Sequence, residues 1–254
     1  MSKSVDISMV IACYNEASHI EKSLPELCAV LDKSGLTYEL VIIDDCSQDN
    51  TVEALHQLCG ERKNVVFRAH EQNVGRGGTV AEGFHLSSGQ VIGYLDIDLE
   101  IGPWYLFPAL EKLKSEGLDG VIAHRVYKLD VHPTILVRQW MSFGFRKLSH
   151  FLLRIPQTDV AGGFKFFKRD KILPIVAQCE STHWFWDTEL VYLADRAGLN
   201  IGEIPVLFLR RPAKESTVRM IPDTLRQLRE TFGLLRRSRR RKSFEKARGN
   251  LEQK

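Results

Sequence analysis

Carboxylates at the ends of two apolar segments are the residues of this chain most able to do chemistry. Asp44 and Asp45 follow the apolar run at residues 40–43, and an acidic segment that begins at Asp96 follows residues 91–95. Both runs have the composition of buried strands. In open parallel sheets, ligands bind in the crevice outside the carboxyl ends of the strands. We therefore expect the two acidic segments to converge on one ligand.

The second acidic segment predicts a divalent metal. Asp96, Asp98 and Glu100 alternate along a segment that we expect to be extended, so their side chains should face the same way. Three carboxylates that face together need a cation. Mg²⁺ and Mn²⁺ suit carboxylate oxygens, and Mg²⁺ leaves positions open for substrate phosphates. A calcium loop is excluded because Ile101 and Phe107 stand where that loop needs Gly and Glu. The segment therefore predicts a nucleoside diphosphate site, with a solvated turn rich in acids as the structural alternative.

Polar side chains also follow the first predicted strand. Tyr14, Asn15 and Glu16 offer a stacking ring, an amide and an acid at a third carboxyl end. Acids at such positions, Asp45 included, accept hydrogen bonds from a base or ribose in dinucleotide-binding folds. Asp49, by contrast, stands where a helix begins and is equally well explained as a helix cap.

A glycine-rich segment at residues 73–79 leads into a predicted helix and includes Arg76. Backbone N–H groups at a helix start attract phosphate, and an arginine adds to this attraction. The segment is not a standard nucleotide loop, because GxGxxG needs glycine where Val80 stands and GxxxxGK[ST] has no match. Kinase, ATPase and dinucleotide-binding functions therefore lose support, and a flexible turn is the structural alternative.

Short apolar strands alternate with helical patterns in units of about 25 to 30 residues, as βαβ crossovers require. This alternation predicts an α/β fold with a mostly parallel sheet flanked by helices. Strands are predicted at residues 4–13, 38–44, 65–69, 91–95, 120–124, 163–167 and 201–206. Helices are predicted at residues 51–59, 75–86, 134–153, 187–197 and from about residue 222.

Length and composition limit the class of protein. With 254 residues, 44% of them hydrophobic, the chain is at the upper edge of a single domain and can fill a large core. Its five cysteines include no CxxC pair, so we expect reduced thiols inside a cell and no zinc. The amino terminus has no basic region followed by an apolar stretch, and no run of about 18 apolar residues occurs. These features predict a protein that is neither exported nor membrane-spanning.

The net charge of +3 hides a strong asymmetry. Residues 207–254 carry 15 Lys and Arg residues against 5 Asp and Glu residues, a net charge of +10, which leaves −7 for residues 1–206. The densest basic run, residues 236–242, can bind nucleic acid or anionic lipid or remain solvated. We expect a domain at residues 1–210 and a basic helical tail at residues 211–254, whose apolar stripe lies on a membrane, packs on the domain or pairs with a second subunit. The stripe consists of Ile221, Leu225, Leu228, Phe232 and Leu235.

Five segments together resemble the inverting family 2 glycosyltransferases, which have the GT-A fold. They are CYNE at 13–16, DDCSQDNT at 44–51, NVGRGG at 73–78, DIDLE at 96–100 and WFWDTEL at 184–190. Their order and spacing cover roughly residues 5–210. Within this family the sequence is most similar to the dolichyl-phosphate and polyprenyl-phosphate sugar synthases. That similarity rests on Arg125, Asp159, GFK at 163–165 and EIPV at 203–206, which follow in the expected order.

The resemblance implies which residues bind the donor nucleotide: Ala12, Tyr14, Asn15, Glu16, Asp45, Asn73, Gly75, Arg76, Gly77 and Asp96. It also implies that Asp96, Asp98 and Glu100 hold the Mg²⁺ or Mn²⁺ ion. The sequence departs from the family pattern in two places: the proline usual before YNE is missing, and Gly162 stands where serine is usual before GF.

On the acceptor side, the resemblance implies that Arg125, Arg138 and Lys165 face the phosphate of the acceptor. The catalytic residues that it implies are Asp98, Arg125 and Asp187. The chemistry of the acceptor bears on Asp187. A sugar hydroxyl needs a general base near the attacking oxygen, and Asp187, at a predicted helix start, can serve as that base or only as a helix cap.

A lipid monophosphate makes a different demand, because its second pKa of about 6 leaves it largely ionised at neutral pH and in need of positioning cations. The sequence favours this acceptor. It predicts an inverting, metal-dependent transfer of a hexose from a nucleotide sugar, of the GDP-mannose or UDP-glucose type, to a polyprenyl or dolichyl phosphate. Transfer to a carbohydrate or glycolipid hydroxyl is the first alternative, and a non-catalytic nucleotide-sugar or RNA-binding module is the second.

A lipid acceptor sets the expected location. We expect the protein in the cytoplasm, at the cytoplasmic face of a membrane, where residues 236–242 would meet anionic lipid. The expected partners are the donor, the lipid acceptor and the membrane surface. Nucleic acid is not expected as a partner, and a homo-oligomer is compatible with the apolar stripe of the tail.

Overall fold

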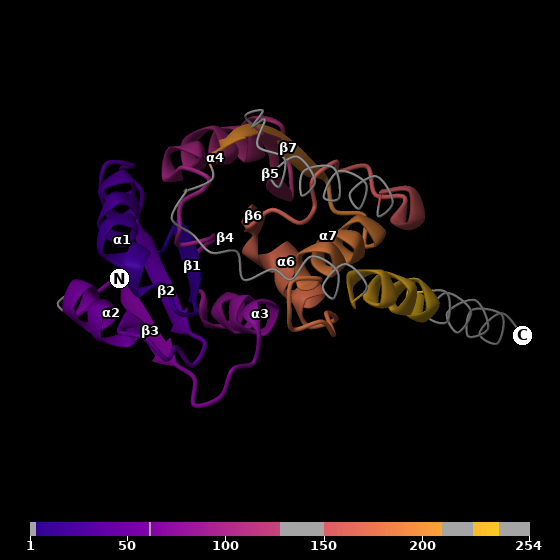
Figure 1. The fold of residues 1–254 in the computed structure, drawn as a ribbon. Helices are drawn as coiled ribbons and strands as arrows, with labels where there is room; N and C mark the ends of the chain where they lie inside the picture. The colour runs from indigo at the N-terminus through magenta and orange to yellow at the C-terminus, as the bar shows by residue number, and fades with distance from the viewer. Residues whose placement is uncertain (1–3, 61, 128–149, 210–225, 239–254) are drawn as a thin grey trace, which may run out of the picture. The chain divides into compact units, whose positions relative to one another are not determined.

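The computed structural model describes residues 4–60, 62–127, 150–209 and 226–238. These residues form a seven-stranded sheet of order β3-β2-β1-β4-β6-β5-β7 (Figure 1). The strands are β1 (Ile7–Cys13), β2 (Tyr38–Asp44), β3 (Val65–Ala69), β4 (Val91–Leu95), β5 (Gly120–Tyr127), β6 (Phe164–Lys168) and β7 (Ile201–Phe208). The helices are α1 (Ala17–Asp32), α2 (Thr51–Cys59), α3 (Arg76–Leu86), the 3₁₀ turn η1 (Pro103–Tyr105), α4 (Leu106–Ser115), α6 (Arg169–Val176) and α7 (Trp186–Arg196).

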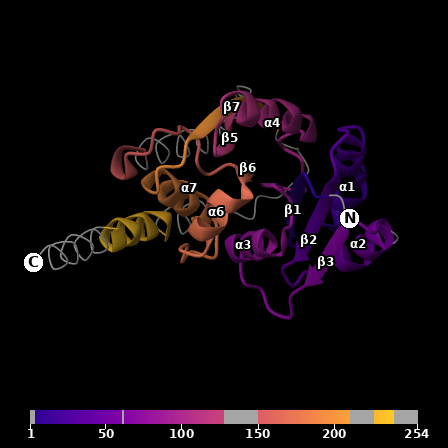
Figure 2. The same cartoon turned by 180° about the vertical axis from the view of Figure 1, so that it is seen from behind.

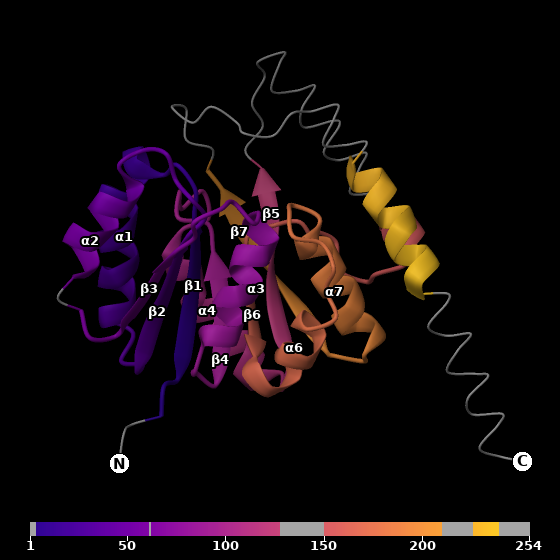
Figure 3. The same ribbon diagram turned by 90° about the horizontal axis from the view of Figure 1, so that it is seen from below.

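The sheet is mostly parallel, which confirms the predicted α/β class. Strands β3, β2, β1 and β4 run parallel to one another, and so do β5 and β7. Strand β6 lies between β4 and β5 and is antiparallel to both (Figure 3). The chain therefore crosses from one parallel set to the other through a single reversed strand.

Helices cover both faces of the sheet because the side chains of a strand alternate between its faces. Ile7, Met9 and Ile11 of β1 belong to one buried cluster with residues of α1, α2 and α4. Val10 points to the opposite face, where Gly83 of α3 packs directly against it. On that face α3, α6 and α7 contact one another (Figures 1 and 2).

Each predicted strand is present, with shifts at its ends. The first begins at Ile7 instead of residue 4, and the fifth continues to Tyr127. Helices α1 and α4 lie between predicted strands but had no predicted range, and helix α6 was not predicted. The helix predicted at residues 134–153 lies mostly outside the described residues, as does the start of the final helix at 222. The described parts of these two segments, residues 150–153 and 226–238, are helical.

The chain divides into two compact units. One consists of residues 1–129 and 157–212 and contains the whole sheet, and the other consists of residues 130–156 and 213–254. The boundary expected at residue 210 stays a prediction. Among the residues that the structure describes, no helix combines the length and apolar character needed to cross a bilayer.

The reversed strand depends on one close contact, which gives a test of the sheet order. Gly93 pairs directly with Phe166, and a β-carbon on Gly93 would overlap the phenyl ring. We expect Gly93→Ala to lower the free energy of unfolding by about 1 to 3 kcal/mol through overpacking. In a double-mutant cycle measured by urea denaturation, Gly93→Ala with Phe166→Leu should cost less than the sum of the single changes. Additive costs would contradict this contact.

Candidate active site

The predicted donor-site residues gather at one edge of the sheet. Cys13 at the end of β1 pairs with Asp44 at the end of β2, and β4 ends beside them at Leu95. The chain proceeds from β1 to β2 and β3 on one side, whereas β4 lies on the other side of β1. This reversal is a topological switch point, where open α/β sheets bind their ligands.

The loops after β1 and β2 are joined by hydrogen bonds. The Asn15 N–H donates to Ser47 Oγ at 2.8 Å, and the Gln48 N–H donates to Asn15 Oδ1 at 2.7 Å. The Glu16 N–H donates to Thr51 Oγ1 at 2.8 Å. Asn15 thus serves the loop structure, and so does the backbone of Glu16.

The ring of Tyr14, in contrast, is 45% exposed at this edge. Ala12 lies just inside the strand, paired with Ile43 of β2. Asn15 and Cys46 both have left-handed backbones, with φ of 56° and 66°. Such conformations are uncommon for residues with a side chain and concentrate at functional sites.

Asp45 is almost fully buried and holds the glycine-rich segment in place. Its carboxylate accepts hydrogen bonds from the N–H groups of Val74 at 2.8 Å and Gly75 at 2.9 Å. The side chain of Asn73 donates to the Asp45 carbonyl at 3.0 Å. In the structure, Asp45 therefore anchors the segment that precedes Arg76. The predicted contact between Asp45 and a nucleoside stays a prediction.

The glycines of this segment are explained by close packing. Gly75 has a left-handed φ of 93°, and a side chain there would overlap the segment at Thr182 and His183. A side chain on Gly77 would overlap Trp186. The Gly78 N–H donates to the Thr182 carbonyl at 3.0 Å. The N–H groups of Gly75 and Gly78 are therefore already bonded within the protein, and phosphate binding at this helix start stays a prediction.

Arg76 is the cation at the centre of the site. Its Nε and Nη2 lie 3.1 and 2.6 Å from Asp96 Oδ1, and its Nη1 lies 2.5 Å from Asp187 Oδ2. The guanidinium also lies over the rings of Tyr94 and Trp184, 5.6 and 5.2 Å from their centroids. The two carboxylates raise the pKa of Arg76 above its ordinary value in spite of burial. Arg76 is thus a fixed positive charge beside Asp96.

Asp187 is 1% exposed and accepts hydrogen bonds from three side chains. Besides Arg76, these donors are Lys165, whose Nζ lies 2.7 Å from Oδ1, and the Tyr94 hydroxyl. Burial alone would raise the pKa of Asp187, but Arg76 and Lys165 outweigh it and hold the pKa below its ordinary value. Asp187 is therefore an ionised, enclosed carboxylate and a poor general base, since a base works best with a pKa near the operating pH.

The predicted acceptor residues are placed differently from one another. Lys165 is fully buried, and burial lowers its pKa while Asp187 opposes the shift. This placement does not support contact between Lys165 and an acceptor phosphate. Arg125 forms a two-point ion pair with Asp159, with Nε and Nη2 each 2.8 Å from a carboxylate oxygen. Arg138 lies outside the described residues.

The acidic segment after β4 is a turn, which corrects the expectation of an extended segment. The Leu99 N–H donates to the Asp96 carbonyl at 3.1 Å, and Leu99 has a φ of 50°. The Glu100 N–H donates to Asp98 Oδ1 at 3.2 Å. Within residues 4–60, 62–127, 150–209 and 226–238, no three His, Cys, Asp or Glu side chains are grouped so as to hold a metal. Among the described residues, Asp96, Asp98 and Glu100 are therefore not grouped as a ready three-carboxylate site, and a metal at this segment stays a prediction.

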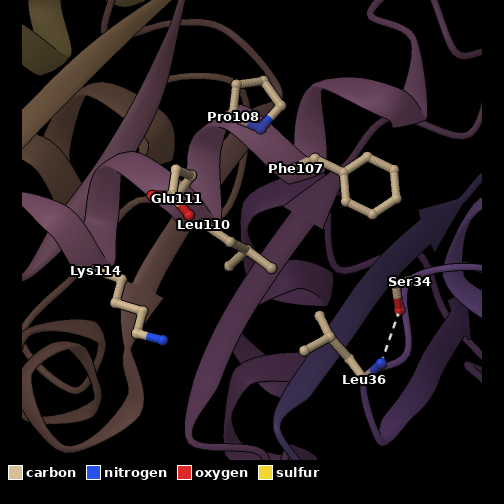
Figure 4. A pocket seen from close by; sticks show the side chains of 7 residues that line it. All are labelled: Ser34, Leu36, Phe107, Pro108, Leu110, Glu111 and Lys114. Atoms are coloured by element: carbon tan, nitrogen blue, oxygen red, sulfur yellow. Dashed lines mark hydrogen bonds between the residues drawn. The ribbon is translucent and has the colours of Figure 1, made fainter.

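A cavity of about 470 Å³ lies away from these residues. It is lined by Ser34 and Leu36, before β2, and by one side of α4 from Phe107 to Lys114 (Figure 4). None of the predicted site residues lines it, so the cavity carries no part of the site.

Sequence reasoning missed three side chains of this network. Tyr94 reads as an ordinary strand residue and His70 belongs to no motif, while Trp184 opens the WFWDTEL segment but was given no role. Trp184 is 42% exposed over Arg76, and His70 contacts Asp45. The WFWDTEL segment was the available signal for Trp184, whereas nothing in the sequence points to His70 or Tyr94.

The carboxylates and the arginine lie at the switch point of the sheet, which is the place where open α/β folds bind their ligands. The family model of glycosyl transferase family 2 matches residues 8–173. Because this match covers more than half of the chain, the chain belongs to glycosyl transferase family 2. The predicted family is therefore confirmed.

Two relatives are similar over most of this chain. Glycosyltransferase AglD of Haloferax volcanii is 28% identical over 223 residues, which cover 87% of this chain and 35% of AglD. Dolichyl-phosphate beta-glucosyltransferase of Saccharomyces cerevisiae is 29% identical over 225 residues, which cover 80% of this chain and 67% of that protein. The chain thus spans about a third of the length of the first relative and about two thirds of the second.

A crystal structure supports the fold. Glucosyl-3-phosphoglycerate synthase from Mycobacterium tuberculosis, in complex with Mn²⁺, uridine diphosphate and glucosyl-3-phosphoglycerate, matches with a TM-score of 0.64 and 18% identity. The match covers 91% of this chain and 78% of that chain. At this identity the likeness concerns the fold alone, and it confirms the predicted GT-A fold.

The buried ion network predicts an acid-sensitive stability. Because the pKa of Asp187 is lowered on folding, its charge stabilises the protein above the ordinary carboxyl pKa of about 3.9, and this contribution is lost as the pH falls through the lowered pKa. Asp187→Asn should therefore cost about 3 to 5 kcal/mol of unfolding free energy at about pH 7. The difference from the unsubstituted protein should shrink below about pH 4.

Urea denaturation followed by circular dichroism at several pH values measures this difference. Glu116→Gln, which breaks an exposed ion pair with Lys112, is the control and should cost less than about 1 kcal/mol. A cost for Asp187→Asn that stays constant down to about pH 3 would show that the charge of Asp187 is not what stabilises the fold.

Proposed function

We propose that this chain transfers a hexose from a nucleotide sugar to a polyprenyl or dolichyl phosphate and inverts the anomeric configuration. Membership of glycosyl transferase family 2 supports the transfer chemistry. The name of the yeast relative, a dolichyl-phosphate beta-glucosyltransferase, supports the acceptor and favours a glucose donor. GDP-mannose remains the second donor to test.

The state of Asp187 is the observation that carries the choice of acceptor. A hydroxyl acceptor needs a general base, and Asp187 was the predicted candidate. In the structure this carboxylate is enclosed, bonded to Lys165, Arg76 and Tyr94, and has a lowered pKa. A phosphate acceptor is already ionised and needs no such base. The observed site therefore supports a phosphate acceptor over a hydroxyl.

Arg76 is the residue that we assign to the leaving diphosphate. It carries a fixed charge, and its partner Asp96 lies at the carboxyl end of β4. In this location it can stabilise the negative charge that develops as the glycosidic bond breaks. Arg125, whose side chain is partly exposed and already oriented by Asp159, is the cation that we assign to the acceptor phosphate.

The carboxylates that follow β4 fit a metal ion that is bound by one or two of them. We assign Asp98 as the main ligand, with Asp96 or Glu100 beside it, because Mg²⁺ commonly takes one or two carboxylates and completes its shell with substrate phosphates and water. The Mn²⁺ and uridine diphosphate in the mycobacterial structure support the use of such an ion. When bound, the metal would neutralise the diphosphate as it leaves.

The first test is the release of nucleoside diphosphate from a panel of UDP- and GDP-sugars with Mg²⁺ or Mn²⁺, with and without polyprenyl phosphate. We expect release only when both the lipid and the metal are present, a hexose-bearing lipid by mass spectrometry, and loss of release with EDTA or Asp98→Ala. Glu116→Gln is the control with an exposed carboxylate removed. Release that is indifferent to the lipid would instead favour a hydroxyl acceptor.

We further propose that the basic tail holds the protein against anionic lipid at the cytoplasmic face of a membrane. The described helix at residues 226–238 carries Arg236 and Arg237, and its Phe232 is 58% exposed. Amphipathic helices with basic and aromatic residues bind at the headgroup boundary. All five cysteines are free thiols, which supports a reducing compartment.

Charge neutralisation tests this membrane contact. Each basic residue near an anionic surface contributes about 1 kcal/mol, so Arg236→Gln with Arg237→Gln should weaken partitioning onto phosphatidylserine-containing liposomes about 30-fold in a flotation assay. Lys22→Gln with Lys33→Gln, two exposed residues of the sheet-containing unit, remove the same charge and should have little effect. Equal losses for the two pairs would rule out a specific role of the tail.

A further inference from the structure

His70 lies between two carboxylates next to the predicted donor site. Its Nδ1 is 2.9 Å from Asp45 Oδ1, and its Nε2 is 2.9 Å from Glu82 Oε2 on α3. The side chain of His70 is only 12% exposed. The backbone N–H of His70 donates to the Asp44 carbonyl, and this hydrogen bond fixes His70 just after the end of β3. Arg68 is a further charged neighbour, and its Nη1 lies 3.1 Å from the other oxygen of Glu82.

This arrangement is that of a charged imidazolium. A neutral imidazole has one N–H and one lone pair, so one ring nitrogen would point its lone pair at a carboxylate oxygen. Two donated hydrogen bonds require both ring protons. Partial burial lowers the pKa of His70, but the hydrogen bonds to Asp45 and Glu82 outweigh it and raise the pKa above its ordinary value.

Both carboxylate partners of His70 are connected to helix α3. Asp45 Oδ1 is shared between His70 and the Val74 N–H, and Asp45 Oδ2 binds the Gly75 N–H directly before Arg76. Glu82 lies further along α3. The charge of His70 therefore connects the end of β2, the start of α3 and the middle of α3.

We propose that His70 is a positioning residue whose charged form fixes the segment carrying Arg76 and thereby sets the affinity for the diphosphate of the donor. This inference rests on the proposed function, in which Arg76 faces that diphosphate. Since the charged form predominates below the pKa of His70, donor affinity falls as the pH rises through that pKa. The effect belongs to binding and so should change KM for the donor more than kcat.

The test measures binding of UDP and GDP with Mg²⁺ by calorimetry from about pH 6 to about pH 9, which spans the range where histidine titrates. The unsubstituted protein should lose about tenfold in affinity across the titration of His70, the size of one charge-assisted hydrogen bond. His70→Asn keeps an N–H for Asp45 but cannot titrate, so the pH step should vanish. Glu82→Gln removes one carboxylate and should move the midpoint about one pH unit lower.

His85→Gln is the matched control, because His85 is an exposed histidine on the same helix. A pH step that persists in His70→Asn, or that His85→Gln also removes, would overturn the role of His70. If His70→Asn does not fold, an unshifted midpoint in Glu82→Gln would have the same meaning.

A second readout needs no nucleotide. The amide protons of Val74 and Gly75 should be less protected from exchange, relative to their intrinsic rates at the same pH, in His70→Asn and above the pKa of His70, as measured by NMR. Unchanged exchange would contradict the inference. Absence of any nucleoside diphosphate binding by the unsubstituted protein would count against the proposed function, while amide exchange would still decide the role of His70.

Discussion

One buried ionised carboxylate holds the site together. Asp187 on α7 binds Lys165 on β6 and Arg76 at the start of α3. It also accepts a hydrogen bond from the hydroxyl of Tyr94 on β4. Removing an ion from water is costly, so the charges are stable only because each has partners at hydrogen-bond distance. Two strands and two helices therefore have their positions fixed by a single charge.

This network separates structural charges from charges that can meet a ligand. Lys165 and Asp187 neutralise each other within the protein, whereas Arg76 extends from Asp187 to Asp96 at the edge of the sheet. The rings of Tyr94 and Trp184 restrict the guanidinium further, so little reorganisation is needed when an anion binds. The same network of buried ion pairs stabilises the fold and orients Arg76 for the proposed binding of a diphosphate.

Several residues that were predicted to bind a ligand form hydrogen bonds between loops and thereby stabilise the fold. Asn15 and Asp45 each hold a neighbouring loop in place, and Cys46, which follows Asp45, adopts a left-handed backbone. Polar residues at the carboxyl ends of strands must satisfy the backbone groups of the loops that begin there. Residue type and position in the sequence do not distinguish a side chain that bonds a loop backbone from one that binds a ligand. For this reason the sequence predicted that Asp45 contacts a nucleoside but did not predict that it anchors the loop before Arg76.

The sequence by itself determined the succession of strands along the chain, the class of fold and the edge where the acids gather, because hydrophobic periodicity and strand ends are local properties. It did not determine that β6 is antiparallel, that residues 96–100 form a turn, or that Lys165 is enclosed. These depend on pairing across long sequence separations: only when β6 lies beside β4 does Lys165 stand opposite Tyr94 and meet Asp187. His70 and Glu82 likewise meet only because α3 packs back onto β1 and β2, since the contact energies that select these partners exist only in the assembled core.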